Sequence, residues 1–257
     1  QLSLIDTHLR RKESALPAPV RPVGLPKSAP ALPAGALTES EAKKALSGYG
    51  IKVARETLAA TPEAAAAAAG QLGFPVVLKA VSRDIVHKSD VGAVRVGLAS
   101  AEAVREAAAD MLAKLARVAP DAKIEGFSVQ EMVRGEAEVI IGVNNDPQFG
   151  PIMMVGLGGI AVEIMRDVAL APAPLCNARA QAMIRSLRSL PLLEGARGRP
   201  PLDIDAVADA VVRLSWLAAD LDHSLRLPSD LNGLHRLYFI TLIDFHQKLF
   251  LGRRGQG

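Results

Sequence analysis

Residues 76–96 read VVLKAVSRDIVHKSDVGAVRV, and this stretch decides how the rest of the chain is interpreted. Its first six residues are apolar except for Lys79, and their length and β-branching predict a buried strand. A lysine inside such a strand is costly unless its ammonium group reaches an anion or extends to water. The polar residues that follow include His87, one of only five histidines in the chain. The stretch is therefore either a solvated connection between strands or a phosphate-binding loop whose histidine takes part in the chemistry.

The phosphate interpretation gives each polar side chain a role. A neutral imidazole at His87 can attack phosphorus and form a covalent intermediate, which divides a difficult transfer into two steps. Asp90 could orient that imidazole, and Lys88 could stabilise the added negative charge. Lys79 would neutralise phosphate oxygens as a point charge. Two alternatives stay open at this point: Lys79 can be a strand-end lysine that reaches solvent, and the His87 loop can be an ordinary solvated turn.

Composition limits the class of protein. A chain of 257 residues with 49% hydrophobic residues can build one large domain or two lobes. The formal net charge is only +3 and the basic residues are scattered, so we expect no nucleic-acid partner. The single cysteine, Cys176, excludes an internal disulfide framework and indicates a reducing compartment. The sequence has no apolar run long enough to span a membrane and no signal-peptide pattern, so we expect a cytoplasmic protein without membrane contact.

A proline-rich segment lies near the start of the chain. Residues 1–14 are short and charged, and we expect them to be the end of a missing upstream domain. Residues 15–36 contain six prolines, which exclude a sustained helix or a central strand and predict a semi-extended linker. A linker implies that another domain precedes this chain in a longer polypeptide.

Local signals after this linker predict an α+β protein. Four helices are expected after capping residues: Thr38, Thr61, Ser100 and Asp203 precede helices over residues 39–48, 62–72, 101–118 and 204–221. A fifth helix is expected over residues 178–188. Strands are expected over residues 75–80, 94–98, 124–133, 139–143, 152–155 and 160–165. This order predicts two lobes with a ligand cleft between them, a mixed βαβ lobe over residues 37–133 and a strand-rich lobe over residues 134–221.

Residues 129–138, VQEMVRGEAE, are expected to join the two lobes. A strand that ends in a short linker exposes backbone amide and carbonyl groups, which match the hydrogen-bonding edge of adenine. Met132 and Val133 would border the faces of the base, and Glu138 could accept hydrogen bonds from ribose hydroxyls. The alternative is a hairpin that carries two solvated carboxylates.

The glycine-rich stretch GLGGIA at residues 156–161 fits the dinucleotide-binding pattern G-x-G-x-x-A. That pattern requires a helix to follow it. Residues 162–166, VEIMR, begin with the alternation of a strand rather than with a helical pattern, so we expect no Rossmann-type site here.

Four stretches together resemble a known family. They are FPVVLKAVS at 74–82, HKSDVGAV at 87–94, VQEMVRGEAEVIIGV at 129–143 and DPQFGPIMMVGLGGIAVE at 146–163. They are similar to the ATP-grasp domain of ADP-forming acyl-CoA synthetases, the acetate–CoA ligase relatives of succinyl-CoA synthetase. The resemblance covers about residues 37–221 and implies a two-lobed fold with a nucleotide cleft. It also implies an acid–thiol ligase that catalyses acyl-CoA + ADP + phosphate = acid + CoA + ATP.

The same resemblance implies ligands, partners and site residues. ATP or ADP would bind with Mg²⁺ bridging its phosphates. The partner would be an upstream CoA-binding and ligase domain or subunit, and acyl-CoA and phosphate would be the small-molecule substrates. His87 would relay phosphate towards ADP from a first phosphohistidine on that partner. Lys79 would contact the nucleotide phosphates, while adenine and ribose would be held by Glu131, Met132, Val133 and Glu138.

The chain departs from the family pattern at two places. Ala93 stands where the family commonly has a second glycine. The family also continues after its last helix with a Glu-x-Asp-x-Asn-Pro strand and a further aspartate, which supply magnesium ligands, whereas this chain contains no Asn-Pro pair. Residues 222–257 contain no alanine and three of the five histidines, and we expect this atypical tail to leave the metal site incomplete unless Asp230 or Asp244 substitutes.

A function from another class is compatible with the same residues. The chain can be a catalytically incomplete nucleotide-binding module that regulates, or docks to, an upstream ligase or acetyltransferase domain. Phosphorylation of His87 in the presence of a phosphate donor distinguishes the enzyme from the module.

Overall fold

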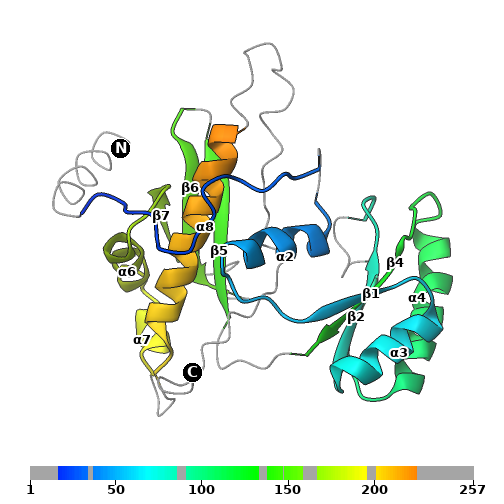
Figure 1. Ribbon diagram of the computed structural model, residues 1–257. Coiled ribbons are helices and arrows are strands. Elements are labelled where there is room, and N and C mark those ends of the chain that lie inside the picture. The colour runs from blue at the N-terminus through cyan, green and yellow to red at the C-terminus, as the bar shows by residue number, and fades with distance from the viewer. Residues whose placement is uncertain are drawn as a thin grey trace. The chain divides into compact units, whose positions relative to one another are not determined.

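The computed structural model describes residues 17–33, 37–85, 91–132, 138–146, 148–158, 167–195 and 201–224. The chain divides into two compact units, and each has its own sheet (Figure 1). The small unit contains residues 32–44 and 52–134, and the large unit contains residues 1–31, 45–51 and 135–257. Unlike the expected lobes, residues 45–51 group with the large unit. Helices together with antiparallel sheets confirm the expected α+β class.

The sheet of the small unit has the strand order β1-β4-β2-β3. These strands are β1 (Glu56–Ala59), β2 (Val76–Val81), β3 (Val94–Leu98) and β4 (Gly126–Glu131). All three hydrogen-bonded pairs are antiparallel. Strand β2 lies between β3 and β4, and β4 lies between β1 and β2, so β1 runs parallel to β2 and β3 runs parallel to β4 without being hydrogen-bonded to it. Strands joined by a helical crossover are therefore not hydrogen-bonded neighbours.

Two helices cover one face of this sheet, α3 (Pro62–Leu72) and α4 (Ala101–Val118), and they pack against each other (Figure 1). Both begin at the expected caps. The hydroxyl of Thr61 accepts a hydrogen bond from the amide of Ala64, and that of Ser100 accepts one from Ala103. Alternate residues of β2 point into the core beneath these helices, with Val76, Leu78 and Ala80 buried. The side chains of the remaining, alternate residues of β2 therefore lie on the opposite face of the sheet.

The helix α2 (Glu39–Gly48) begins with the expected capping box. The backbone amide of Thr38 donates to the Glu41 carboxylate at 2.7 Å, and the amide of Glu41 donates back to the Thr38 hydroxyl at 3.3 Å. This pair of bonds fixes the first turn of α2. The first turn also carries Glu39, and residues 39–44 belong to the small unit.

The large unit contains the three-stranded antiparallel sheet β5-β6-β7. Its elements are β5 (Val139–Asp146), β6 (Gly150–Leu157), β7 (Val168–Pro172), α6 (Asn177–Arg185), α7 (Leu190–Leu193) and α8 (Ile204–Ser224). Helices α6 and α8 pack against the sheet and against each other. The sequence predicted β5, β6, α6 and α8 but not β7, α7 or β1. The strand expected at residues 160–165 lies outside the described residues.

The glycine-rich stretch after β6 has a structural explanation. Strand β7 pairs antiparallel with β6 across Gly156, whereas a dinucleotide-binding fold needs a parallel strand after a helical crossover. A Cβ atom on Gly156 would lie 2.7 Å from the carbonyl oxygen of Asp167, and one on Gly158 would lie 2.7 Å from Cγ of Glu138. These glycines allow close backbone approach in the large unit, and the antiparallel pairing of β6 with β7 differs from the parallel pairing of a dinucleotide-binding fold.

Residues 17–31, here called the strap, contain neither helix nor strand but are docked on the large unit. The Arg21 guanidinium forms an ion pair with Asp220 of α8 and lies 4.7 Å from the centre of the Trp216 ring. The hydroxyl of Tyr49 donates a hydrogen bond to the same Asp220 carboxylate. The linker predicted from the prolines is therefore held against α8 at Arg21 by a charged anchor.

Candidate functional site

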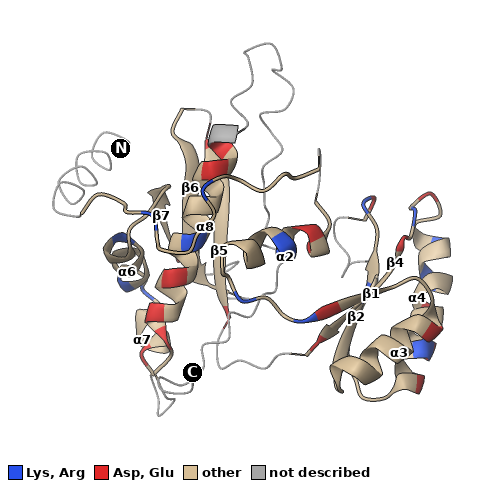
Figure 2. Ribbon diagram, in the orientation of Figure 1, with Lys and Arg blue, Asp and Glu red and all other residues tan. Residues whose placement is uncertain are grey.

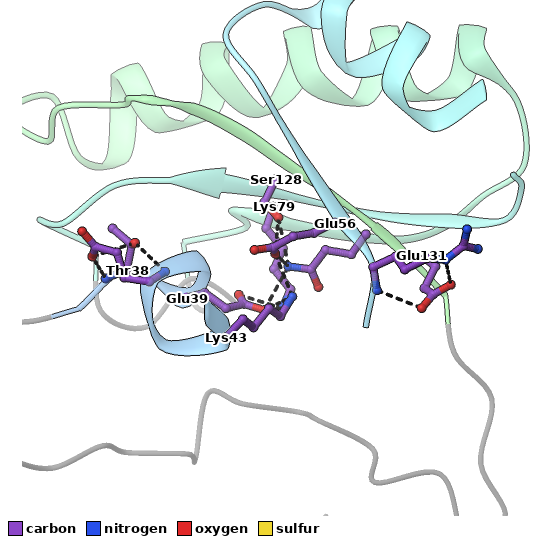
Figure 3. Close-up of polar contacts among 10 residues, drawn as sticks. Thr38, Glu39, Lys43, Glu56, Lys79, Ser128 and Glu131 are labelled. Carbon is purple, nitrogen blue, oxygen red and sulfur yellow. Dashed lines mark hydrogen bonds and ion pairs between the residues drawn. The ribbon is translucent and has the colours of Figure 1, made fainter. Parts of the chain in front are cut away.

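The open face of the small sheet carries a row of polar side chains. Lys79 on β2 is paired in register with Ser128 on β4, and Gln130 on β4 is paired with Glu56 on β1. Directly paired residues in an antiparallel sheet share a face, so these four side chains lie on the side opposite α3 and α4. Helix α2 adds two more charged side chains, as Figure 3 shows. The polar cluster, as it is called below, consists of Glu39, Lys43, Glu56, Lys79, Ser128 and Gln130.

Lys79 contacts a carboxylate within this cluster. Its Nζ donates to the two carboxylate oxygens of Glu39 at 2.8 and 2.9 Å (Figure 3). The Lys79 side chain is only 16% exposed. The structure therefore does not support the alternative in which this lysine simply extends into solvent. Its ammonium lies on the sheet face, where an anion compensates its charge.

Glu39 receives further donors besides Lys79. Gln130 Nε2 donates to it at 2.9 Å, and Lys43 lies one helical turn away with Nζ at 3.2 Å. Burial alone would raise the pKa of this carboxyl group, but the positive charges of Lys79 and Lys43 and these hydrogen bonds hold it below its ordinary value. Glu39 is therefore ionised at neutral pH.

The rest of the cluster compensates the second lysine. Lys43, which is buried, places its Nζ 2.8 Å from the Glu56 carboxylate. Glu56 also accepts hydrogen bonds from Ser128 at 3.1 Å and from Gln130 at 3.2 Å. Two lysines thus face two glutamates, and the cluster has no net charge. Buried charges of this kind are tolerated because each is paired and hydrogen-bonded.

Sequence reasoning identified Lys79 but missed its partners. Two signals were available. Glu39 and Lys43 are four residues apart on a capped helix, a spacing that places them on one helix face. Ser128 and Gln130 alternate with buried Phe127 and Val129 in β4, a pattern that marks a polar sheet face. What the sequence did not show is that these two faces meet.

The expected catalytic residues His87 and Asp90 lie in residues 86–90, outside the described part of the chain. The residues just before this loop make structural contacts. Asp84 accepts a hydrogen bond from the amide of Lys123 at 2.8 Å, and Arg83 forms an ion pair with Glu41 at 2.8 Å. After the loop, Ala93 is fully buried and its carbonyl accepts from the amide of Ala80 at 2.9 Å. Its methyl group therefore fills core space.

The expected adenine segment lies at the end of β4, and Val133 falls outside the described residues. The Glu131 carboxylate accepts hydrogen bonds from the backbone amide of Arg55 at 2.8 Å and from its Nε at 2.7 Å. Burial raises the pKa of Glu131, but these bonds outweigh it and hold the pKa below its ordinary value. The carboxylate is thus not simply solvated, as the hairpin alternative required.

The backbone donors of this segment are also engaged. The amide of Glu131 donates to the carbonyl of Arg55 at 3.0 Å, and that of Met132 donates to the carbonyl of Pro75 at 3.3 Å. A base bound here would therefore have to use carbonyl groups or amides beyond Met132. Glu138 belongs to the large unit, where its carbonyl accepts from the amide of Gly158 at 2.7 Å. The structure thus brings Lys79, Glu131 and Met132 into one unit and Glu138 into the other.

The described residues do not fit a magnesium site. They include no group of three or more His, Cys, Asp or Glu side chains that could hold a metal ion. The two carboxylates on the Lys79 face, Glu39 and Glu56, are each neutralised by a lysine ammonium. Mg²⁺ prefers carboxylate, phosphate and water oxygens without a competing cation. The candidate site is therefore best described as a cationic lysine within a compensated polar face.

Figure 2 shows acidic and basic residues interspersed along α4, whereas those on α8 are mainly acidic. Within the part of the chain that the structure describes, no helix combines the length and hydropathy needed to cross a bilayer.

Comparison with known proteins identifies the family. A family model described as an ATP-grasp domain matches residues 29–227. The beta subunit of acetate–CoA ligase [ADP-forming] I from Pyrococcus furiosus is 43% identical over 185 residues, which are 72% of this chain and 80% of the subunit. Acetate–CoA ligase [ADP-forming] I from Archaeoglobus fulgidus is 42% identical over 198 residues, which are 77% of this chain but only 28% of that longer protein.

A solved structure is similar over most of the chain. It is acetyl-coenzyme A synthetase 1 of Ca. Korarchaeum cryptofilum in complex with coenzyme A and Mg-AMPPCP, with its phosphohistidine segment pointing towards the nucleotide-binding site. The TM-score is 0.62 at 39% identity, and the similarity covers 83% of this chain and 84% of that chain. The chain therefore belongs to the ATP-grasp domain family, as a relative of the beta subunits of ADP-forming acetate–CoA ligases.

Proposed function

We propose that the chain is the nucleotide-binding, phosphoryl-transfer part of an ADP-forming acyl-CoA synthetase. The observation that carries this proposal is the family match over residues 29–227, which spans both units and includes Lys79, His87 and Glu138. The proposed reaction is acyl-CoA + ADP + phosphate = acid + CoA + ATP. The chain spans only about a quarter of the fused relative, so the acyl substrate would be selected by residues that this chain does not contain.

Nucleotide binding would centre on the small unit. Lys79 would bind phosphate oxygens of ADP or ATP, because its ammonium lies on the polar sheet face and is already desolvated there. Carbonyl groups of Glu131 and Met132, with the backbone of Val133, would hold adenine. Glu138 would accept hydrogen bonds from the ribose hydroxyls.

His87 would carry the phosphoryl group between the partner and the nucleotide. Its neutral imidazole nitrogen attacks phosphorus of a phosphohistidine on the partner, so that one phosphorus–nitrogen bond forms as the other breaks. A terminal phosphate oxygen of ADP then attacks the same phosphorus, His87 leaves as neutral imidazole, and ATP forms. Asp90 would orient the ring through its second nitrogen. These bonds are similarly energetic, so both steps remain reversible.

The partner would be a CoA-binding and ligase domain. Among the relatives, this unit is a separate beta subunit in Pyrococcus furiosus and a little over a quarter of one longer chain in Archaeoglobus fulgidus. We propose the fused or the associated form for this chain as well, in the cytoplasm, which its single cysteine favours.

The phosphohistidine tests the proposal directly. The full chain is incubated with the partner domain of a related ligase, acetyl-CoA and radiolabelled phosphate. We expect an acid-labile, base-stable label on the chain that His87→Asn abolishes and the control His8→Asn retains. Chase with ADP should move the label into ATP. A label that survives His87→Asn would contradict the assigned carrier.

The second candidate is a nucleotide-binding module without turnover. It is favoured by the lack of magnesium ligands. The described carboxylates form no metal site, and the sequence lacks the Glu-x-Asp-x-Asn-Pro strand. The same experiment distinguishes the two candidates. ADP binding without any phosphohistidine label in the wild-type chain would favour the module.

A further inference from the structure

The Lys79 ammonium can bind an anion, and in the structure the Glu39 carboxylate occupies this position. One carboxylate places its two oxygens 2.8 and 2.9 Å from the lysine Nζ, at the hydrogen-bonding distance that phosphate oxygens would adopt. The two residues are forty positions apart in the sequence, one on a helix and one on a strand. Their side chains are 18% and 16% exposed, so water screens the pair only partly.

If the contact between Glu39 and Lys79 opens, Glu39 and Lys43 still have other polar partners in the cluster. Glu39 retains Lys43 at 3.2 Å and Gln130 at 2.9 Å, and it is the first residue of α2, where a negative charge is stabilised by the helix dipole. Lys43 retains Glu56 at 2.8 Å. When the Lys79 ammonium turns to another anion, Glu39 and Glu56 therefore share Lys43 and keep the hydrogen bonds from Gln130, and the rest of the polar cluster carries one net negative charge.

We propose that Glu39 is a positioning residue that competes with nucleotide phosphate for the Lys79 ammonium. The proposal rests on the proposed function, which assigns Lys79 to the phosphates. Without nucleotide, Glu39 holds Lys79 on the sheet face and compensates its charge. When ADP or ATP binds, a phosphate oxygen takes this place, and Glu39 remains on Lys43 and Gln130. The exchange lowers the affinity for phosphate below that of an uncompensated lysine, which favours release of the nucleotide.

Calorimetric titration of the full chain with ADP and with adenosine tests the competition. Glu39→Gln removes the competing charge while keeping the size of the side chain. We expect ADP to bind roughly three- to tenfold more tightly, because one partly buried ion pair no longer has to open. Adenosine carries no phosphate, so its affinity should change less than about twofold.

Glu56→Gln is the matched control. It removes the same charge from the same sheet face, but its carboxylate contacts Lys43 rather than Lys79. We expect its effect on ADP affinity to stay within about twofold. An equal gain in Glu56→Gln would show a general effect of charge and would overturn the competition. An unchanged or weaker ADP affinity in Glu39→Gln, relative to adenosine, would overturn it as well.

A second variant keeps the test valid if Glu39→Gln does not fold. Glu39→Asp retains the charge but shortens the side chain by one methylene, so the carboxylate no longer reaches Lys79 with both oxygens. Competition predicts a smaller gain in ADP affinity in the same direction, whereas a through-space charge effect predicts none. If the wild-type chain and both variants bind neither ADP nor adenosine, the proposed function itself is wrong. ADP binding that ignores Glu39 rejects only the competition.

Discussion

Asp220 shows how single residues join distant parts of the large unit. Its carboxylate accepts from Arg21 of the strap and from the hydroxyl of Tyr49, which is almost fully buried. Burial, and then the hydrogen bond and negative charge of Asp220, raise the pKa of Tyr49 well above its ordinary value, so the phenol stays protonated and acts as the donor. Three residues from separate segments therefore depend on one another.

We expect Arg21→Met to lower the free energy of unfolding by about 1–2 kcal/mol, because Asp220 loses a charged donor and keeps only the tyrosine. Urea unfolding monitored by circular dichroism measures this. Lys27→Met is the control, since Lys27 lies exposed on the same strap. It should change stability by less than about 0.5 kcal/mol. Equal effects of the two substitutions would mean that Arg21 does not anchor the strap.

The lowered pKa of Glu39 predicts a pH dependence. A carboxyl group whose pKa is lower in the folded than in the unfolded state stabilises the fold above its unfolded value, which is 4.5 here. That contribution is complete at neutral pH and is lost as the pH falls through the lowered folded value. The stability difference between wild type and Glu39→Gln should therefore shrink below pH 4.5. A difference that grows on acidification would contradict the ion pair.

At the scale of elements, local signals gave helix starts correctly and missed short strands. Thr61 and Ser100 cap their helices because a cap bonds to amides only three residues away, which makes it visible in sequence. Strand β1 has four residues, of which Glu56 and Thr57 are polar, and it is held by pairing with β4 some seventy residues later. A strand stabilised by a distant partner leaves little local pattern.

The capping box of α2 gives an element-scale prediction. Thr38→Ala removes an acceptor and a donor at the helix start, so we expect a loss of about 1 kcal/mol in the free energy of unfolding. Ser40→Ala, at the second residue of α2, serves as the control and should cost less than about 0.5 kcal/mol in the free energy of unfolding. Chemical denaturation of both variants measures the difference. Similar values for both would show that the box does not stabilise α2.

Two glycines in the small unit predict opposite effects of the same substitution. Gly126 begins β4 with φ at +136°, and a Cβ atom there would lie 2.5 Å from the carbonyl oxygen of Ala59. Gly126→Ala should therefore destabilise the protein by more than about 2 kcal/mol. Gly70 lies in α3 with no atom near its Cβ position, and Gly70→Ala should raise stability by about 0.4–1 kcal/mol. Thermal unfolding of the pair provides the measurement.

At the scale of the whole molecule, local signals supplied the α+β class and the family resemblance supplied the ATP-grasp fold, which the structure and the comparisons confirm. Composition and periodicity alone did not give the strand order β1-β4-β2-β3, because interleaved crossovers are set by long-range pairing. The partners of Lys79 were missed for the same reason. Glu39 is forty residues away on a helix, and no local pattern connects it to β2.

The metal requirement is also a property of the whole molecule. Because the sequence contains no Asn-Pro pair and residues 222–257 are expected to leave the metal site incomplete, we expect ADP affinity to change by less than about threefold when Mg²⁺ is replaced by EDTA. Calorimetric titration in the two buffers measures this. A much larger loss that Asp244→Asn reproduces in magnesium buffer would show that the chain does supply a ligand, from residues 225–257.

The stacking of Arg21 on Trp216 gives the molecule an intrinsic optical probe. Trp216 is the only tryptophan in the sequence, so its emission reports from a single place, the helix surface beneath the strap. Departure of the guanidinium would hydrate the indole and shift its emission to longer wavelength. Release of the strap from α8 could then be followed by fluorescence, without attaching a dye.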